Sequence, residues 1–226
     1  EGKSVLEIDD AFRACAFNKP VELPTGVGFC MLLNFACLQQ IGFFSECFGQ
    51  GYGEENDWCR RAAEAGYRNV LSPNVFVYHK HGVSFSSRTD KTKQMRIKEN
   101  LRLLNKLHPG YDLLVSDFVH DDGLFFIREF VQWRLHKCEH AVLFVTHALG
   151  GGANGYLTEY IRKISFKCSA YVLKIQADAK SVMLLNCGLE RELYFDVTQM
   201  SQQQFDRLLS LLGIDEIFVN QLVSYP

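Results

Sequence analysis

The sequence lacks two features that would narrow its function at once. It has no run of the ~20 apolar residues that a membrane-spanning helix needs, and no signal peptide is visible. Its formal net charge is only −2 over 226 residues, so it has no general basic field that could hold nucleic acid. These absences predict a cytoplasmic protein that does not bind nucleic acid.

The sequence also lacks any Cys-x-x-Cys pair, although it contains eight cysteines. Most of them lie inside apolar or helical runs, which predicts buried free thiols in a reducing compartment and not a disulfide framework or a zinc site. Hydrophobic residues make up 47% and charged residues 22%, an ordinary globular composition. The chain begins with Glu1 in place of Met, so we expect it to be a piece of a longer protein.

The segment Gly51 to Arg60 concentrates negative charge at the start of a predicted helix. Its acids are Glu54, Glu55 and Asp57, and good helix formers continue to residue 65 before Gly66. Glu55 falls on the apolar stripe of that helix, whereas Asp57 falls on the opposite stripe, where it can pair with Arg61. A carboxylate aimed at a partly dry cleft suits a general base. The alternative is that the acids only complement the helix dipole.

Two apolar segments flank this helix and predict strands. Residues 28–33 form a continuous apolar run suited to a strand covered on both faces, preceded by the turn Thr25-Gly-Val-Gly28. Residues 74–81 alternate, so that Val75, Val77, His79 and His81 would share one face. Helices are predicted over 34–40 and 93–107.

In this order, residues 23–84 resemble the C-terminal half of the catalytic domain of family 2 glycosyltransferases, which have the GT-A fold. The family motif Gly-Glu-Asp-x-Asp appears here as Gly53-Glu-Glu-Asn-Asp57, which puts Glu55 in the position of the catalytic aspartate. The resemblance implies inverting transfer of a hexosyl group from a nucleotide sugar to a glycan acceptor. Glu55 would be the base, with Asp57 also in the catalytic set.

The resemblance further implies substrate contacts from Thr25, Gly26, Glu54 and Trp58, although Trp58 also reads as core packing. It implies a divalent cation, Mg²⁺ or Mn²⁺, bound partly by His79, with His81 as the second choice. The nucleotide-binding half of a GT-A domain, with its Asp-x-Asp motif, is absent from the sequence. A non-catalytic glycan-binding or scaffold fragment is therefore the alternative.

The pattern changes after residue 115. Residues 116–139 predict a helical linker with a break at Asp121-Asp-Gly123. The amphipathic run after that break could pack between domains or contact the inner face of a membrane peripherally. Strand and helix patterns then alternate over 140–226, which predicts a parallel sheet.

Within this second part, residues 141–160 resemble the opening strand, glycine loop and helix of family 4-type GT-B glycosyltransferases. Gly150, Gly151 and Gly152 would lie where backbone N–H groups can meet an anionic substrate group. The charged residue and arginine that follow the glycines in that family are replaced by Ala153, Asn154 and Gly155.

The predicted fold class is therefore α/β. A partial GT-A domain, the acceptor half, covers residues 1–115, and a Rossmann-like GT-B domain begins in residues 140–226.

Overall fold

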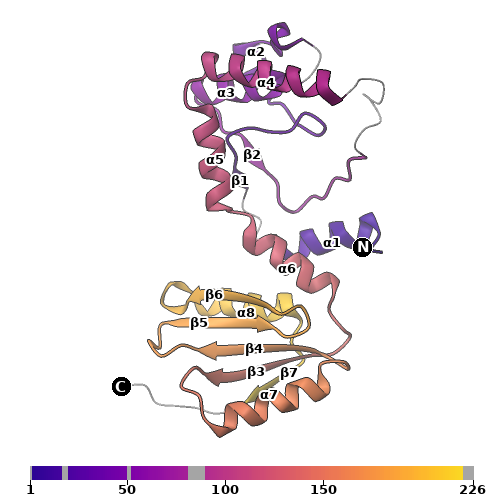
Figure 1. Ribbon diagram of the computed structural model, residues 1–226, viewed down its shortest axis with the longest axis vertical. Coiled ribbons are helices and arrows are strands. Elements are labelled where there is room, and N and C mark those ends of the chain that lie inside the picture. The colour runs from indigo at the N-terminus through magenta and orange to yellow at the C-terminus, as the bar shows by residue number, and fades with distance from the viewer. Residues whose placement is uncertain (1, 17–19, 50–51, 81–89, 221–226) are drawn as a thin grey trace. The chain divides into compact units, whose positions relative to one another are not determined.

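The computed structural model describes residues 2–16, 20–49, 52–80 and 90–220, except for the side chains of 90–93. The chain divides into two compact units, residues 2–127 and 128–226. Both units combine helices and strands (Figure 1), which confirms the α/β class.

The first unit is mainly helical. Its elements, in chain order, are α1 (Val5–Cys15), β1 (Val21–Glu22), α2 (Phe35–Ile41), the 3₁₀ turn η1 (Glu46–Phe48), α3 (Glu54–Glu64), β2 (Val70–Leu71), α4 (Asp90–Leu107), α5 (Tyr111–Asp121) and the beginning of α6 (Phe125–Leu135). Helices α2, α3 and α4 confirm the helices predicted over 34–40, within the acidic motif and over 93–107. Helix α2 begins after Asn34, whose side-chain oxygen accepts a hydrogen bond from the Cys37 amide at 3.1 Å.

The two strands predicted on either side of the acidic helix are wrong. A strand needs a neighbour, and the sheet that forms among the described residues of this unit is the short antiparallel pair of β1 and β2. Residues 28–33 have no regular secondary structure. Met31 and Leu33 pack against the core of α2 and α3, whereas Phe29 and Leu32 are exposed.

Residues 74–80 also remain outside any sheet, and Phe76 in this segment contacts α1. The Phe76 amide donates a hydrogen bond to Asp9 Oδ1 at 2.8 Å, and the Phe76 ring stacks on Phe12 with centroids 5.6 Å apart. Val75 and Val77 are exposed.

The second unit is built on a five-stranded sheet. Its elements are β3 (Ala141–His147), α7 (Gly152–Ile164), β4 (Ser169–Ile175), β5 (Ser181–Asn186), β6 (Arg191–Asp196), the 3₁₀ turn η2 (Val197–Gln199), α8 (Gln202–Leu212) and β7 (Glu216–Val219). The strand order is β6-β5-β4-β3-β7. Strands β4 and β7 run parallel to β3, but β5 and β6 are antiparallel.

The prediction of a parallel sheet is therefore right for three strands and wrong for two. The links 176–180 and 187–190 contain no helix, and a parallel crossover needs about a dozen residues or more. The chain can only reverse in such short links, which makes β4, β5 and β6 an antiparallel series.

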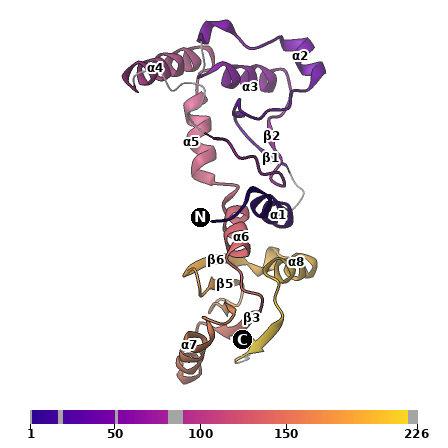
Figure 2. The ribbon, with the colours of Figure 1, turned by 90° about the vertical axis from the view of Figure 1, so that its right-hand side faces the viewer.

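Helices cover both faces of this sheet. Leu157 and Ile161 of α7 pack on Val142, Phe144 and other side chains that point to one face. On the other face, the buried Trp133 ring of α6 stacks on Tyr171 with centroids 5.8 Å apart. Figure 2 shows α7 and α8 on opposite sides of the strands.

The predicted linker, residues 116–139, is divided between the two units. Helix α5 ends at Asp121, because the next residue, Asp122, has a left-handed backbone conformation (φ 41°). Helix α6 then begins at Phe125. The division between the units falls inside α6, so the buried Phe130 and Trp133 belong to the core of the second unit. Among the described residues, no helix has both the length and the apolar character to cross a membrane.

The cysteines provide a test of this packing. We expect a thiol reagent at pH 8 to modify the exposed Cys30, Cys47 and Cys138 quickly. Burial raises the pKa of Cys187 to about 11, so little of the reactive thiolate forms at pH 8 and this residue should react slowly. Mass spectrometry of the labelled peptides measures both rates.

The remaining cysteines, Cys15, Cys37, Cys59 and Cys168, are buried and should react only after unfolding. Rapid labelling of these four in the folded chain would contradict the described cores.

Candidate functional site

The acidic motif forms the first turn of α3, and its entry is set by two unusual backbone conformations. Tyr52 has φ 72° and Gly53 has φ 132°, and Gly53 caps the helix. A Cβ atom on Gly53 would lie 2.6 Å from Cδ1 of the Phe48 ring, which is too close for any side chain. Glycine is therefore required where the chain turns into α3.

Glu55 lines a cleft between the start of α3 and α4. The cleft has a volume of about 180 Å³, and its walls are Tyr52, Gly53, Glu55, Asn56, Ile97, Asn100, Leu101 and Leu104. Glu55 is the one carboxylate among these residues. Apolar side chains of α4, Ile97, Leu101 and Leu104, also line the cleft.

The turn at residues 25–28 lies against the same end of α3. The Thr25 hydroxyl donates a hydrogen bond to Asn56 Oδ1 at 3.1 Å, and the Gly26 amide donates one to Cys59 Sγ at 3.3 Å. A Cβ atom on Gly28 would lie 3.7 Å from Glu55 Oε1. The structure thus brings the turn of residues 25–28 against α3, with Gly28 beside Glu55.

Tyr111, which the sequence analysis missed, lies near this site but is not part of the cleft wall. Burial raises the pKa of its phenol, a hydrogen bond with Thr25 lowers that pKa, and the nearby charge of Glu55 raises it. Tyr111 opens α5, far from the acidic motif in sequence. No local pattern could have linked it to Glu55, because only the packing of α5 against α3 brings the two together.

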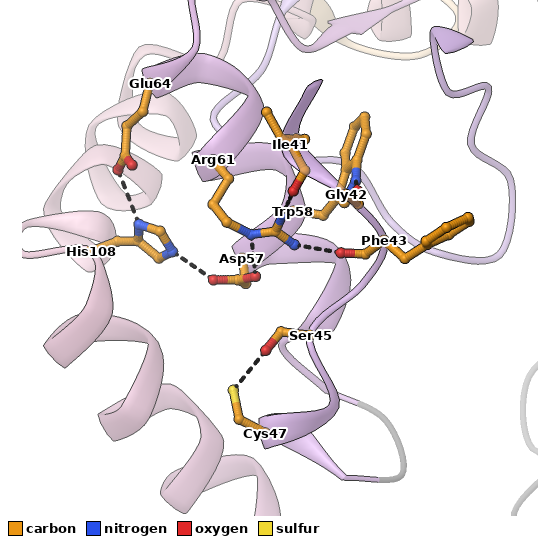
Figure 3. A network of polar contacts seen from close by, with 10 residues as sticks. All are labelled: Ile41, Gly42, Phe43, Ser45, Cys47, Asp57, Trp58, Arg61, Glu64 and His108. Carbon is orange, nitrogen blue, oxygen red and sulfur yellow. Dashed lines mark hydrogen bonds and ion pairs between the residues drawn. The ribbon is translucent and has the colours of Figure 1, made fainter. Parts of the chain in front are cut away.

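Asp57 lies at the buried centre of a network of polar contacts, shown in Figure 3. The Asp57 residue is only 4% exposed to solvent. Oδ2 of Asp57 is 2.8 Å from Arg61 Nε, and Oδ1 is 2.9 Å from His108 Nε2. The other ring nitrogen of His108 is 3.1 Å from Glu64 Oε1.

The arginine of this network holds the preceding loop. Arg61 Nη1 donates to the Ile41 carbonyl at 2.7 Å, and Arg61 Nη2 donates to the Phe43 carbonyl at 2.8 Å. The predicted pair of Asp57 with Arg61 is confirmed, with the Asp57 carboxylate buried and Arg61 partly exposed. Because both oxygens of Asp57 bind neighbouring side chains, its geometry favours a structural role over the catalytic role predicted for it.

The structure supports core packing for Trp58, the other of the two roles considered for it. Trp58 is 4% exposed and packs with Cys37, Cys59 and Ala62. Its indole N–H donates a hydrogen bond to the Gly42 carbonyl at 2.9 Å. The ring is therefore a core side chain, and no sugar can stack on it.

Glu54 lies beside the site and does not form part of the cleft wall. It is only partly exposed, and its buried Oε2 has no hydrogen-bond partner among the described residues. Of these two adjacent residues, only Glu55 lines the cleft.

The metal prediction rests on His79 alone. The His79 ring is exposed and stacks on Phe29 with centroids 4.5 Å apart. Within the described part of the chain, no three His, Cys, Asp or Glu side chains come together in a group that could hold a metal ion. His81 lies outside the described residues. One imidazole does not make a metal site, so the described residues do not by themselves fit a divalent cation.

In the second unit, the predicted strand–loop–helix arrangement at Gly150–Gly152 is confirmed. Gly150 and Gly151 have φ values of 77° and 106°, and Gly152 is the first residue of α7. The Asn154 side chain ties the loop to the strand, because it accepts a hydrogen bond from the Thr146 hydroxyl and donates one to the His147 carbonyl. The cleft that Glu55 lines does not include this loop.

Comparison of the chain with known protein families, with curated proteins and with solved structures finds no match.

The entry to α3 can be tested with one glycine substitution and a matched control. Gly53→Ala should lower the free energy of unfolding by about 2–4 kcal/mol, because the methyl group meets the Phe48 ring and the backbone is strained. Gly66→Ala should cost only about 1 kcal/mol, because its φ is 90° but nothing lies within 4 Å of the added Cβ. Urea unfolding followed by circular dichroism measures both, and equal losses would contradict the close contact with Phe48.

The buried ion pairs give a second test. Asp57→Asn should destabilise the first unit by about 2 kcal/mol or more, because it leaves Arg61 and His108 without their carboxylate. Asp112→Asn, an exposed carboxylate at the start of α5, should change stability by less than about 0.5 kcal/mol. Thermal unfolding of the two variants compares them, and a stable Asp57→Asn chain would show that the network does not hold α3.

Proposed function

We propose that this chain is the acceptor-side part of an inverting glycosyltransferase, with Glu55 as the general base. The observation that carries the proposal is the position of the Glu55 carboxylate in the cleft between α3 and α4, next to Gly28. The resemblance of residues 23–84 to family 2 glycosyltransferases supports it. In the parent enzyme, the donor would be a nucleotide sugar and the acceptor a glycan.

The proposed step is a single displacement. Glu55 takes the proton of an acceptor hydroxyl while that oxygen forms a bond to the anomeric carbon of the donor sugar. The bond from the anomeric carbon to the nucleotide diphosphate breaks, and the diphosphate leaves with the electron pair. Attack from the face opposite the leaving group inverts the configuration.

Neighbouring polar side chains could position the acceptor hydroxyl. Asn56 lines the cleft beside Glu55 and is oriented by the hydrogen bond from Thr25. Thr25 in turn interacts with Tyr111, so three elements fix one corner of the cleft. A site held by side chains from several rigid elements keeps the reacting groups in place.

The donor and the divalent cation are proposed to bind elsewhere in the parent enzyme. A divalent ion would stabilise the departing diphosphate, and His79 could supply one ligand to it. The other ligands would have to come from outside the described residues.

The second unit is proposed to be the start of a family 4-type GT-B domain. The glycine loop between β3 and α7 supports this proposal, because its backbone can approach an anionic group closely. We further propose that the protein works in the cytoplasm, at or near the inner face of the membrane.

A non-catalytic glycan-binding role is the second candidate, and the size of the cleft favours it. A volume of about 180 Å³ is below the range of about 300–1,000 Å³ that is common for small-molecule sites. Such a cleft can admit the hydroxyl groups of one sugar but not a whole nucleotide sugar. Transfer activity separates the two candidates.

The catalytic test is Glu55→Gln in the complete protein that contains this chain. Turnover with a nucleotide sugar should fall by about 10²-fold or more, because the amide cannot accept the proton, while the melting temperature should change little. The matched control is Glu99→Gln, an exposed carboxylate on α4 that does not line the cleft, and this variant should keep full turnover.

The assay is release of nucleoside diphosphate from a panel of UDP-sugars and dTDP-sugars with glycan acceptors. Wild-type turnover in Glu55→Gln would exclude Glu55 as the base. Absence of transfer in the wild-type complete protein would favour the non-catalytic role.

A further inference from the structure

The first unit contains a second and larger cleft, which has no role in the proposed chemistry. Its volume is about 320 Å³, and it lies between the segment after β1, the C-terminal half of α3 and helix α5. It shares no lining residue with the cleft of Glu55. The side chains that matter for its chemistry are Glu22, Arg60, Tyr67, Asp117, Phe118 and Asp121.

The polar groups of this cleft have unused hydrogen-bonding capacity. The buried Nε of Arg60 has no hydrogen-bond acceptor among the described residues. The carboxylates of Glu22, Asp117 and Asp121 are exposed, and no hydrogen bond or ion pair of theirs is present within the part of the chain that the structure describes. The cleft therefore offers one cationic donor and three anionic acceptors to a ligand.

The charge of the lining excludes most ligand classes. Three carboxylates and one guanidinium give a formal charge of 1 − 3 = −2, which repels phosphates and nucleotides. An organic cation would match the carboxylates but would leave Arg60 without an acceptor, next to another positive charge. A neutral ligand that both donates and accepts hydrogen bonds matches all four groups.

Sugar hydroxyls have this property, since each one donates one hydrogen bond and accepts others. The rings of Tyr67 and Phe118 also line the cleft, and aromatic side chains offer an apolar face to the C–H groups of a sugar ring. The Tyr67 hydroxyl is held by a hydrogen bond to Gln40 Oε1 at 3.1 Å, which fixes the position of its ring. The volume lies within the common range of about 300–1,000 Å³ for small-molecule sites.

We infer that this cleft binds a neutral sugar unit of a glycan, at a distance from the cleft where Glu55 would act. The inference rests on the proposed function for the choice of a glycan as the ligand. A second sugar contact of this kind would hold a chain of several sugar units on the first unit while its end reaches Glu55. Two linked contacts raise the apparent affinity for long acceptors over short ones.

The test measures binding to the full chain of 226 residues by saturation-transfer and amide-shift NMR. The probes are maltose, cellobiose, N,N′-diacetylchitobiose and their longer oligomers, with spermidine as an organic cation and inorganic phosphate as an anion. We expect at least one neutral oligosaccharide to shift the amides of residues near Tyr67 and Asp117. Phosphate should shift none of them.

The variants assign the binding to the cleft. Asp117→Ala combined with Asp121→Ala should weaken saccharide binding by about tenfold or more, because two hydroxyl acceptors are lost. Asp112→Ala is the matched control, since it removes an exposed carboxylate from the same helix outside the cleft, and it should leave the affinity unchanged. Circular dichroism establishes that the variants fold.

Binding of spermidine alone at these residues, or no response to any of the neutral oligosaccharides, would overturn the inference. Equal affinity in the double variant and in the control would overturn it as well. The two proposals fail separately, because the turnover of Glu55→Gln tests the proposed function and the saccharide affinity of the Asp117→Ala, Asp121→Ala double variant tests this inference. If the complete protein binds saccharide but has no transfer activity, the proposed function is refuted and the inference that this cleft binds sugar is supported.

Discussion

The first unit depends on the buried carboxylate of Asp57, which joins α3 to two other parts of the fold. Through Arg61 it holds the loop carbonyls that precede α3, and through His108 it holds the end of α4. A buried charge is tolerated only where such partners compensate its lost hydration. The resulting position of α3 turns the neighbouring Glu55 toward the cleft. The structural acid and the candidate catalytic acid thus lie two residues apart on one helix but differ in their surroundings.

Backbone geometry adds a second constraint on the same helix. Gly53 reaches its φ of 132° only because it has no side chain, and the Phe48 ring occupies the space that a Cβ would need. The helix therefore begins at Glu54, which puts Glu55 and Asn56 in the first turn. Helix α4 packs across this turn and supplies the apolar wall of the cleft. A local requirement for glycine and a distant helix together define the candidate site.

The two units differ in how much of their structure local pattern could predict. In the second unit, strand and helix positions followed from hydrophobic periodicity, and the glycine loop before α7 was placed correctly. The directions of β5 and β6 were predicted wrongly, although the short links on either side of β5 already excluded parallel crossovers. In the first unit, the apolar run at 28–33 reads as a strand by composition alone. It forms none, because hydrogen bonds from a neighbouring strand are absent there among the described residues.

By itself, the sequence determined the α/β class, the helices around the acidic motif and the pair of Asp57 with Arg61, because helix periodicity and glycine positions act over a few residues. The choice of Glu55 as candidate base rests on the resemblance to the family motif and stays a proposal. Only the tertiary structure decided that Asp57 and Trp58 are buried in the core and that Tyr111 lies beside Thr25. It also placed Arg60 in a cleft with the carboxylates of α5. These features depend on contacts between residues far apart in the chain, and such contacts leave no local pattern to read.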